Sequence, residues 1–317
     1  MKYILRRASL GPGPRIALQR EQYDAIVQAR LKLRLAADIE EKLDLVLENL
    51  VDYERDLLSI AIRDCLFPST DFGNGMNQLH LAARRAMNLL SSARSYIDQT
   101  KHATSRFFGG DAARAEKVTA LFRQQYDGHL EYRVAEALRN YVQHLSLPVH
   151  ILRSSVKWEE QDEAQQRLRY WTVPLLSLDQ LVEEGEFKKT VLEELLTARS
   201  NAKEKTWELT PTLRRYVECL TIIHQGVRSL LAEELKAAHE VILHAMGLVR
   251  AEGGDFECVE GLLVVATDDA GVVTARHNVN ELPWGRRAAL AQKNESFPNL
   301  ALRYVSGEHP GDGAQPK

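Results

Sequence analysis

Long stretches of the chain carry apolar residues at helical intervals, and this periodicity limits what the chain can fold into. Over residues 38–66 the apolar positions recur every three or four residues among acidic ones, and the pattern stops before Pro68. The same spacing predicts a second helix over residues 77–108, which Gly109 and Gly110 end. The sequence therefore predicts a mainly α fold, an elongated helical bundle.

Three further helices are expected. Asp111 can cap a stretch that reaches residue 145 with a break near Gly128. Ser177, followed by Gln180, resembles a capping box that opens a helix over residues 178–205. A second start signal, Thr210 with Pro211, then opens a long helix that reaches about residue 250.

Two hairpins interrupt the helical pattern. Residues 149–158 and 168–173 are rich in β-forming residues and flank the polar loop 159–165, which predicts a hairpin insertion. Residues 262–266 and 272–275 predict a second hairpin, followed by a short helix at 284–293, a strand at 300–305 and a disordered tail from Gly307. The expected divisions are 1–37, unassigned; 38–147, the helical bundle; 148–175, the β-hairpin; 176–251, a long helical hairpin; and 252–317, a small C-terminal α+β segment with the tail.

Composition places the chain among soluble globular proteins. Hydrophobic residues make up 44% and charged residues 27%, which is typical neither of a disordered chain nor of a membrane protein. No apolar run approaches the roughly 18 residues that a membrane span needs. Arg6 and Arg7 precede glycines and prolines instead of an apolar segment, so no signal peptide is indicated. We expect a cytoplasmic protein with no membrane partner.

Neither a metal nor a cofactor is expected. Cys65, Cys219 and Cys258 are scattered with no CxxC pair, so buried thiols are the simplest interpretation. His239 and His244 lie one residue too far apart for an HExxH zinc motif, which favours an interfacial or partly buried histidine pair. No phosphate-binding, dinucleotide-binding or esterase motif is present in the sequence.

The most informative segment is residues 138–144, which combines an arginine, two amides and a histidine on one predicted helix. At about 100° per residue, Arg139 and His144 lie about 140° apart, and Asn140 and Gln143 fall between them. These residue types suit cleavage of a phosphodiester beside a 2′-hydroxyl group. Histidine titrates near neutrality and can take the proton, while arginine stays charged and offers planar donors to phosphate oxygens.

No metal is required for that reaction, because the 2′-hydroxyl group of RNA is already positioned beside the scissile phosphate. The expected product is a 2′,3′-cyclic phosphate. His144 would act as general base or acid, Arg139 would stabilise the phosphorane, and Asn140 would orient them.

The segment Arg139, Asn140 and His144 resembles the R-N-x-x-x-H motif of HEPN-domain proteins, many of which are metal-independent RNases. The resemblance covers residues 38–150 and extends to the later helices. It implies a HEPN-like bundle, a homodimer in which two motifs face one another, and a role as a toxin or in antiphage defence. A departure is Ser146, where one branch of the family carries a tyrosine.

RNA is the expected partner, with Arg94, Arg133 and Gln143 as binding residues. Residues 74–150 hold ten basic and six acidic residues, whereas residues 31–66 hold five and nine. Two alternatives stay open. The polar residues of 138–144 can simply be the solvated face of an amphipathic helix, and the whole chain can be a non-catalytic helical adaptor that binds a protein partner or inhibitor.

Overall fold

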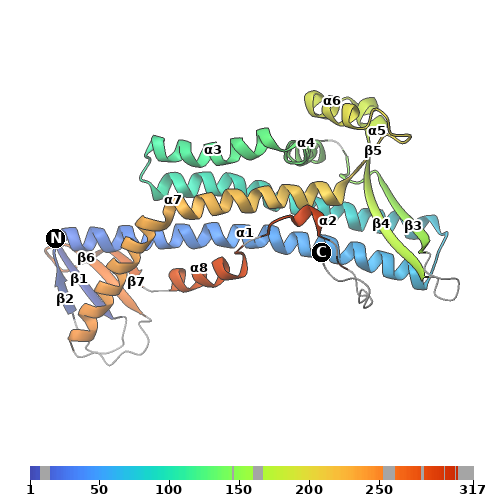
Figure 1. The fold of residues 1–317 in the computed structure, drawn as a ribbon. Coiled ribbons are helices and arrows are strands. Elements are labelled where there is room, and N and C mark those ends of the chain that lie inside the picture. Colours follow the sequence, from blue (N-terminus) through green and yellow to red (C-terminus); the bar gives the residue numbers. More distant parts are fainter. Residues whose placement is uncertain are drawn as a thin grey trace, which may run out of the picture. The chain divides into compact units, whose positions relative to one another are not determined.

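The fold is mainly helical, as predicted, with two small antiparallel sheets (Figure 1). It is described by a computed structural model that covers residues 1–7, 15–144, 146–159, 167–252, 261–279, 282–295, 297–303 and 305. Its α-helices are α1 (Arg20–Leu66), α2 (Phe72–Phe107), α3 (Ala112–Gly128), α4 (Leu130–His144), α5 (Leu178–Glu184), α6 (Lys189–Ala198), α7 (Leu209–Ala251) and α8 (Leu282–Lys293). Its strands are β1 (Lys2–Arg7), β2 (Arg15–Leu18), β3 (Ile151–Glu159), β4 (Arg167–Ser177), β5 (Thr206–Glu208), β6 (Leu262–Thr267) and β7 (Val273–Val279).

Contacts within the chain define two compact units, to both of which α1, α2 and α7 contribute. The first unit comprises Met1–Asn49, Ser91–Gly128 and Leu220–Glu295, and the second comprises Leu50–Leu90, His129–Cys219 and Ser296–Lys317. No helix within the described parts of the chain has both the length and the hydropathy that crossing a membrane requires.

The first unit contains a four-stranded antiparallel sheet in the order β2-β1-β6-β7. Strand β1 pairs with β6 so that Leu5 lies opposite Val264, which joins the start of the chain to the second predicted hairpin. Every residue of β6 is buried, so this strand forms the centre of the sheet. Residues 1–37, left unassigned from sequence, therefore supply two strands and the beginning of α1.

Helix α1 begins at Arg20, well before the expected start near Asp38. The buried positions Tyr23, Ile26, Ala29 and Leu33 recur at intervals of three and four residues, as an amphipathic helix requires. The alternation of leucines at residues 31–35 obscured that period, because Leu31 is only partly buried. The predicted end before Pro68 is confirmed.

In the second unit, β3, β4 and β5 form a three-stranded antiparallel sheet in that order. The β3–β4 pair confirms the predicted hairpin, although most of the predicted loop 159–165 lies outside the described residues. Ser177 caps α5 as predicted, since its Oγ accepts a hydrogen bond from the Gln180 backbone N–H at 3.3 Å.

Two predictions beyond that point are wrong. The single helix over 178–205 is instead the two helices α5 and α6, because Gly185 adopts a left-handed conformation with φ of 70° and ends α5. The strand expected at 300–305 is instead a short 3-10 helix, Leu300–Leu302, which follows Asn299 at a positive φ of 56°. The tail from Gly307 and the thiol of Cys258 lie outside the described residues.

Candidate functional site

Helix α4 is amphipathic, and this property decides which motif residues meet solvent. It begins just after the break at Gly128 and ends at His144. Its buried face consists of apolar and aromatic side chains: Tyr132, Val134, Ala135, Ala137, Leu138 and Tyr141. Asn140, Gln143 and His144 are exposed and Arg139 is partly exposed, so none of these four side chains fills the core.

Arg139 and Asn140 contact one another directly. The Nη1 group of Arg139 donates a hydrogen bond of 2.9 Å to Oδ1 of Asn140. Within the described residues no hydrogen bond joins Arg139 to His144. The structure thus brings the arginine and the amide of the motif together, while the histidine lies at the last turn of the helix.

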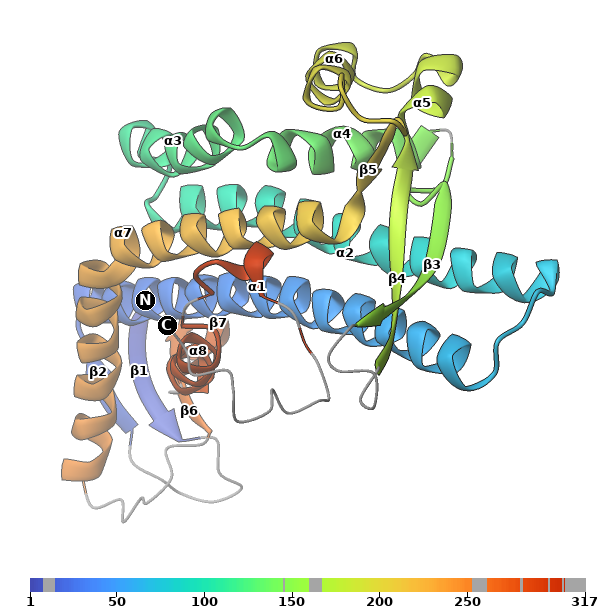
Figure 2. The same cartoon turned by 45° about the vertical axis from the view of Figure 1, so that its right-hand side comes forward.

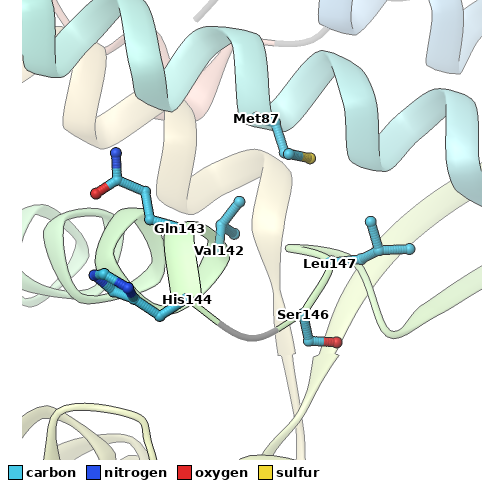
Figure 3. A pocket seen from close by; sticks show the side chains of 6 residues that line it. All are labelled: Met87, Val142, Gln143, His144, Ser146 and Leu147. Carbon is cyan, nitrogen blue, oxygen red and sulfur yellow. The ribbon is translucent and has the colours of Figure 1, made fainter.

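An open pocket of about 530 Å³ lies at the end of α4. Six residues line it: Met87, Val142, Gln143, His144, Ser146 and Leu147. In Figure 3, Gln143 and His144 project from α4 toward the same side, and Met87 approaches from the neighbouring helix α2. The pocket therefore presents an imidazole and an amide to solvent beside an apolar wall.

The last turn of α4 is anchored from its buried side by Tyr141. The Tyr141 hydroxyl group lies 3.1 Å from Nε2 of His150, which precedes β3, and contacts the carboxylate of Glu184 on α5. Nδ1 of His150 accepts a hydrogen bond of 3.1 Å from the Ser177 backbone N–H. The neutral His150 ring therefore carries its proton on Nε2 and donates it toward Tyr141, whose hydroxyl donates to Glu184.

The electrostatics of this anchor favour neutral side chains at Tyr141 and His150. Burial raises the pKa of Tyr141 to about 12, and its hydrogen bond to Glu184 adds to the effect. Burial lowers the pKa of His150. The Tyr141 anchor was missed from sequence because no local pattern links Tyr141, His150 and Glu184, which come together only through the fold.

The predicted RNA-binding residues are found in three different settings. Gln143 lines the open pocket. Arg133 forms a two-pronged ion pair with Glu194 of α6, with Nε–Oε1 and Nη2–Oε2 distances of 3.2 and 2.5 Å. Arg94 belongs to the first unit and pairs with Asp98 at 2.8 Å. The structure therefore places only Gln143 beside His144.

The other candidates from the sequence have structural roles. His239 stacks on Trp284 with ring centroids 3.9 Å apart. Cys219 is buried, as predicted, whereas Cys65 is exposed, so the prediction of a buried thiol is wrong at that position. In the described parts of the chain no group of three His, Cys, Asp or Glu side chains is arranged to hold a metal ion.

These features define a mainly helical protein whose amphipathic helix α4 presents an R-N-x-x-x-H segment beside an open pocket. Comparison with known protein families, curated proteins and solved structures finds no match to this chain.

Proposed function

We propose that the protein is a metal-independent endoribonuclease whose active site is formed by Arg139, Asn140 and His144. The observation that carries the proposal is the exposure of these side chains on α4, with His144 lining an open pocket. The resemblance of the motif to that of HEPN-domain proteins supports the same chemistry and extends it to a toxin or antiphage effector.

In the proposed reaction the 2′-oxygen of RNA attacks the adjacent phosphorus atom. His144 accepts the 2′-hydroxyl proton as the P–O2′ bond forms, and a protonated histidine donates a proton to the 5′-oxygen as the P–O5′ bond breaks. Arg139 donates hydrogen bonds to the equatorial oxygens of the phosphorane. The products are a 2′,3′-cyclic phosphate and a 5′-hydroxyl end, and no metal takes part.

The separation of the motif side chains favours a homodimer as the working form. Within one copy the Arg139 guanidinium group binds Asn140, and no hydrogen bond in the described residues links it to His144. A two-fold dimer that faces two motifs would let the arginine of one copy approach the histidine of the other. It would also supply the two histidines, one as base and one as acid, that the reaction requires.

The decisive experiment is cleavage of mixed RNA in the presence of EDTA by the wild-type protein and by the His144→Ala variant. We expect cleavage in chelator, loss of cleavage in the variant, and 2′,3′-cyclic phosphate ends on the fragments. His244→Ala is the matched control, because His244 is also exposed on a helix. Equal cleavage by the His144→Ala and His244→Ala variants, or a requirement for added metal, would refute the proposal.

A second candidate function, a helical interaction module, is favoured by exposed apolar side chains on α1. Val51, Leu58, Ile62 and Leu66 are 54%, 45%, 52% and 64% exposed. Their spacing of seven, four and four residues places them on one side of the helix. We call these four residues the α1 stripe. An exposed stripe of this kind is typical of a surface that pairs with another helix.

A further inference from the structure

The β3–β4 hairpin, whose two strands are seen side by side in Figure 2, has two chemically different faces in its described residues. Because side chains alternate along a strand, the register assigns each residue to a face. One face, which we call the Trp171 face, holds Arg153, Ser155 and Lys157 of β3 opposite Val173, Trp171 and Arg169 of β4. The opposite face exposes Val156, Trp158 and Leu168, which carry no charge.

On the Trp171 face an indole ring lies among cations. Trp171 is 36% exposed and stands opposite Ser155, a small residue. Arg153 and Lys157 flank Ser155 on β3, and Arg169 lies two residues before Trp171 on β4. Arg153 and Lys157 are diagonal neighbours of Trp171, about 7–8 Å away, and Arg169 lies about 7 Å along the same strand, so each cation lies within reach of a ligand stacked on the indole.

The Trp171 face continues into a pocket of about 370 Å³ beside β5. The segment between α6 and β5 contributes Arg199, Lys203 and Glu204 to its lining, and β5 contributes Glu208. Arg153 pairs with Glu204 at 2.6 Å, and both side chains are exposed. With Lys157 and Arg169, the described side chains of the Trp171 face and its pocket comprise five cations and two carboxylates, an excess of three positive charges.

We propose that the Trp171 face binds single-stranded RNA, with a base stacked on Trp171 and the neighbouring phosphates beside Arg153, Lys157 and Arg169. Stacking on an exposed aromatic ring flanked by cations is how proteins hold single strands without reading their sequence. The carboxylates of Glu204 and Glu208 can accept hydrogen bonds from the exocyclic amino groups of a base. The choice of RNA over DNA rests on the proposed nuclease function, whereas single-strand binding rests on the Trp171 face alone.

An acidic peptide is the competing ligand, and the position of Trp171 decides against it. A peptide held by charge alone would use the cations and leave the indole ring without a role. A nucleotide strand uses both, because each base supplies a flat π-surface and each phosphate a negative charge.

The test is fluorescence anisotropy of a labelled, 2′-O-methylated single-stranded oligonucleotide, which the proposed nuclease reaction cannot cleave. Trp171→Ala should weaken binding about fivefold or more, and Trp171→Phe should restore most of it by keeping an aromatic face. Trp158→Ala, on the opposite face, is the matched control and should change affinity less than about twofold. Lys157→Ala should reduce the slope of log affinity against log salt by about one unit.

Equal losses in the Trp171→Ala and Trp158→Ala variants would overturn the inference, as would competition by poly-glutamate as strong as that by unlabelled RNA. Circular dichroism of each variant identifies one that has failed to fold, and Trp171→Phe then provides the comparison. Failure of the nuclease proposal appears separately, as unchanged cleavage of unmodified RNA by His144→Ala. A Trp171-dependent affinity for the methylated probe stands whatever that cleavage assay gives.

Discussion

The Nε2 atom of His224 lies 2.8 Å from the Oε2 atom of Glu40, and the two side chains are 1% and 2% exposed. The Tyr96 hydroxyl group lies 3.1 Å from the other ring nitrogen of His224. Arg228 also binds the carboxylate, with an Nη2–Oε2 distance of 2.6 Å. Glu40 on α1 is therefore held in the core of the first unit by partners from α7.

Replacing Glu40 by Gln should destabilise the protein strongly. The change leaves Arg228 and the half-buried Arg287 without their buried counter-charge, and breaking such a pair costs about 3–5 kcal/mol. Chemical denaturation followed by circular dichroism measures the loss. Glu41→Gln is the matched control, because the Glu41 side chain is 46% exposed and pairs with Arg286, so its loss should stay near 0.5 kcal/mol. Equal losses in the two variants would contradict the role assigned to Glu40.

Acid should destabilise the wild-type protein through Glu40 and His224. Burial opposes ionisation of Glu40, but hydrogen bonds from His224 and Arg228 outweigh it and lower the pKa of this carboxyl group from 4.5 to about 2. Burial lowers the pKa of His224 below its ordinary 6.5. Both folded-state pKa values lie below the unfolded ones, so the unfolded chain binds more protons and stability falls as the pH falls.

The His224 contribution should begin to fade below about pH 6.5 and the Glu40 contribution below about pH 4.5, continuing toward pH 2. Free energies of unfolding measured between pH 7 and pH 3 test this, with Glu40→Gln as the comparison. The variant should have a flatter pH dependence below pH 4.5 than the wild-type protein. A Glu40→Gln profile parallel to that of the wild type would contradict the lowered pKa.

The two helical glycines of α7 should respond in opposite ways to alanine. A Cβ atom on Gly226 would lie 2.8 Å from both Cδ atoms of Leu121, whereas one on Gly247 would have no neighbour within 4 Å. Gly247→Ala should stabilise the protein by about 0.5–1 kcal/mol through helix propensity. Gly226→Ala should be less stable than Gly247→Ala by about 1–3 kcal/mol, because Leu121 must move. Thermal unfolding measures the stabilities of both variants. Equal stabilities would show that Leu121 can move away from the new Cβ atom without destabilising the protein.

The helix ends that depend on local chemistry were predictable from sequence. Pro68 and Gly109 end α1 and α2 as expected, because proline cannot continue a helix and Gly109 takes a positive φ of 64°. The start of α1 was not predictable in the same way. Tyr23 in its first turn packs against Tyr3 of β1 and His277 of β7, with ring centroids 4.7 and 6.2 Å away, and no local pattern records contacts with residues so distant in sequence.

The candidate site also combines features that the local sequence predicts with contacts that it does not predict. The sequence identified Arg139, Asn140 and His144 because they lie within one helical segment, and the solvent-facing placement of all three follows from the apolar period of α4. The ion pair between Arg133 of α4 and Glu194 of α6 could not be predicted from the sequence. Contacts between side chains that are distant in sequence depend on the packing of whole elements, which periodicity does not specify.

The α1 stripe should mediate self-association. An apolar stripe along one side of a helix can pair with the same stripe of a second copy, and a lysine within it would place a charge in that contact. We expect Ile62→Lys to lower the mass measured by light scattering from dimer to monomer. Leu243→Lys is the matched control, because Leu243 is 42% exposed and lies on α7, outside the α1 stripe. A wild-type monomer, or equal masses for the two variants, would exclude the stripe as the dimer surface.

Replacing Arg139 by Lys should separate the contribution of the planar guanidinium group to catalysis from the contribution of its positive charge. The proposed reaction uses the planar fork of Arg139 on two phosphorane oxygens, and the Nη1 group that binds Asn140 shows that Asn140 can hold the fork in place. Lysine keeps the charge but presents it from a single atom, so we expect kcat for RNA cleavage to fall about a hundredfold while KM changes little. Arg123→Lys, at an exposed arginine paired with Glu116, controls for the substitution itself. A rise in KM with unchanged kcat would instead make Arg139 a ground-state RNA contact, and an unchanged rate would remove it from the reaction.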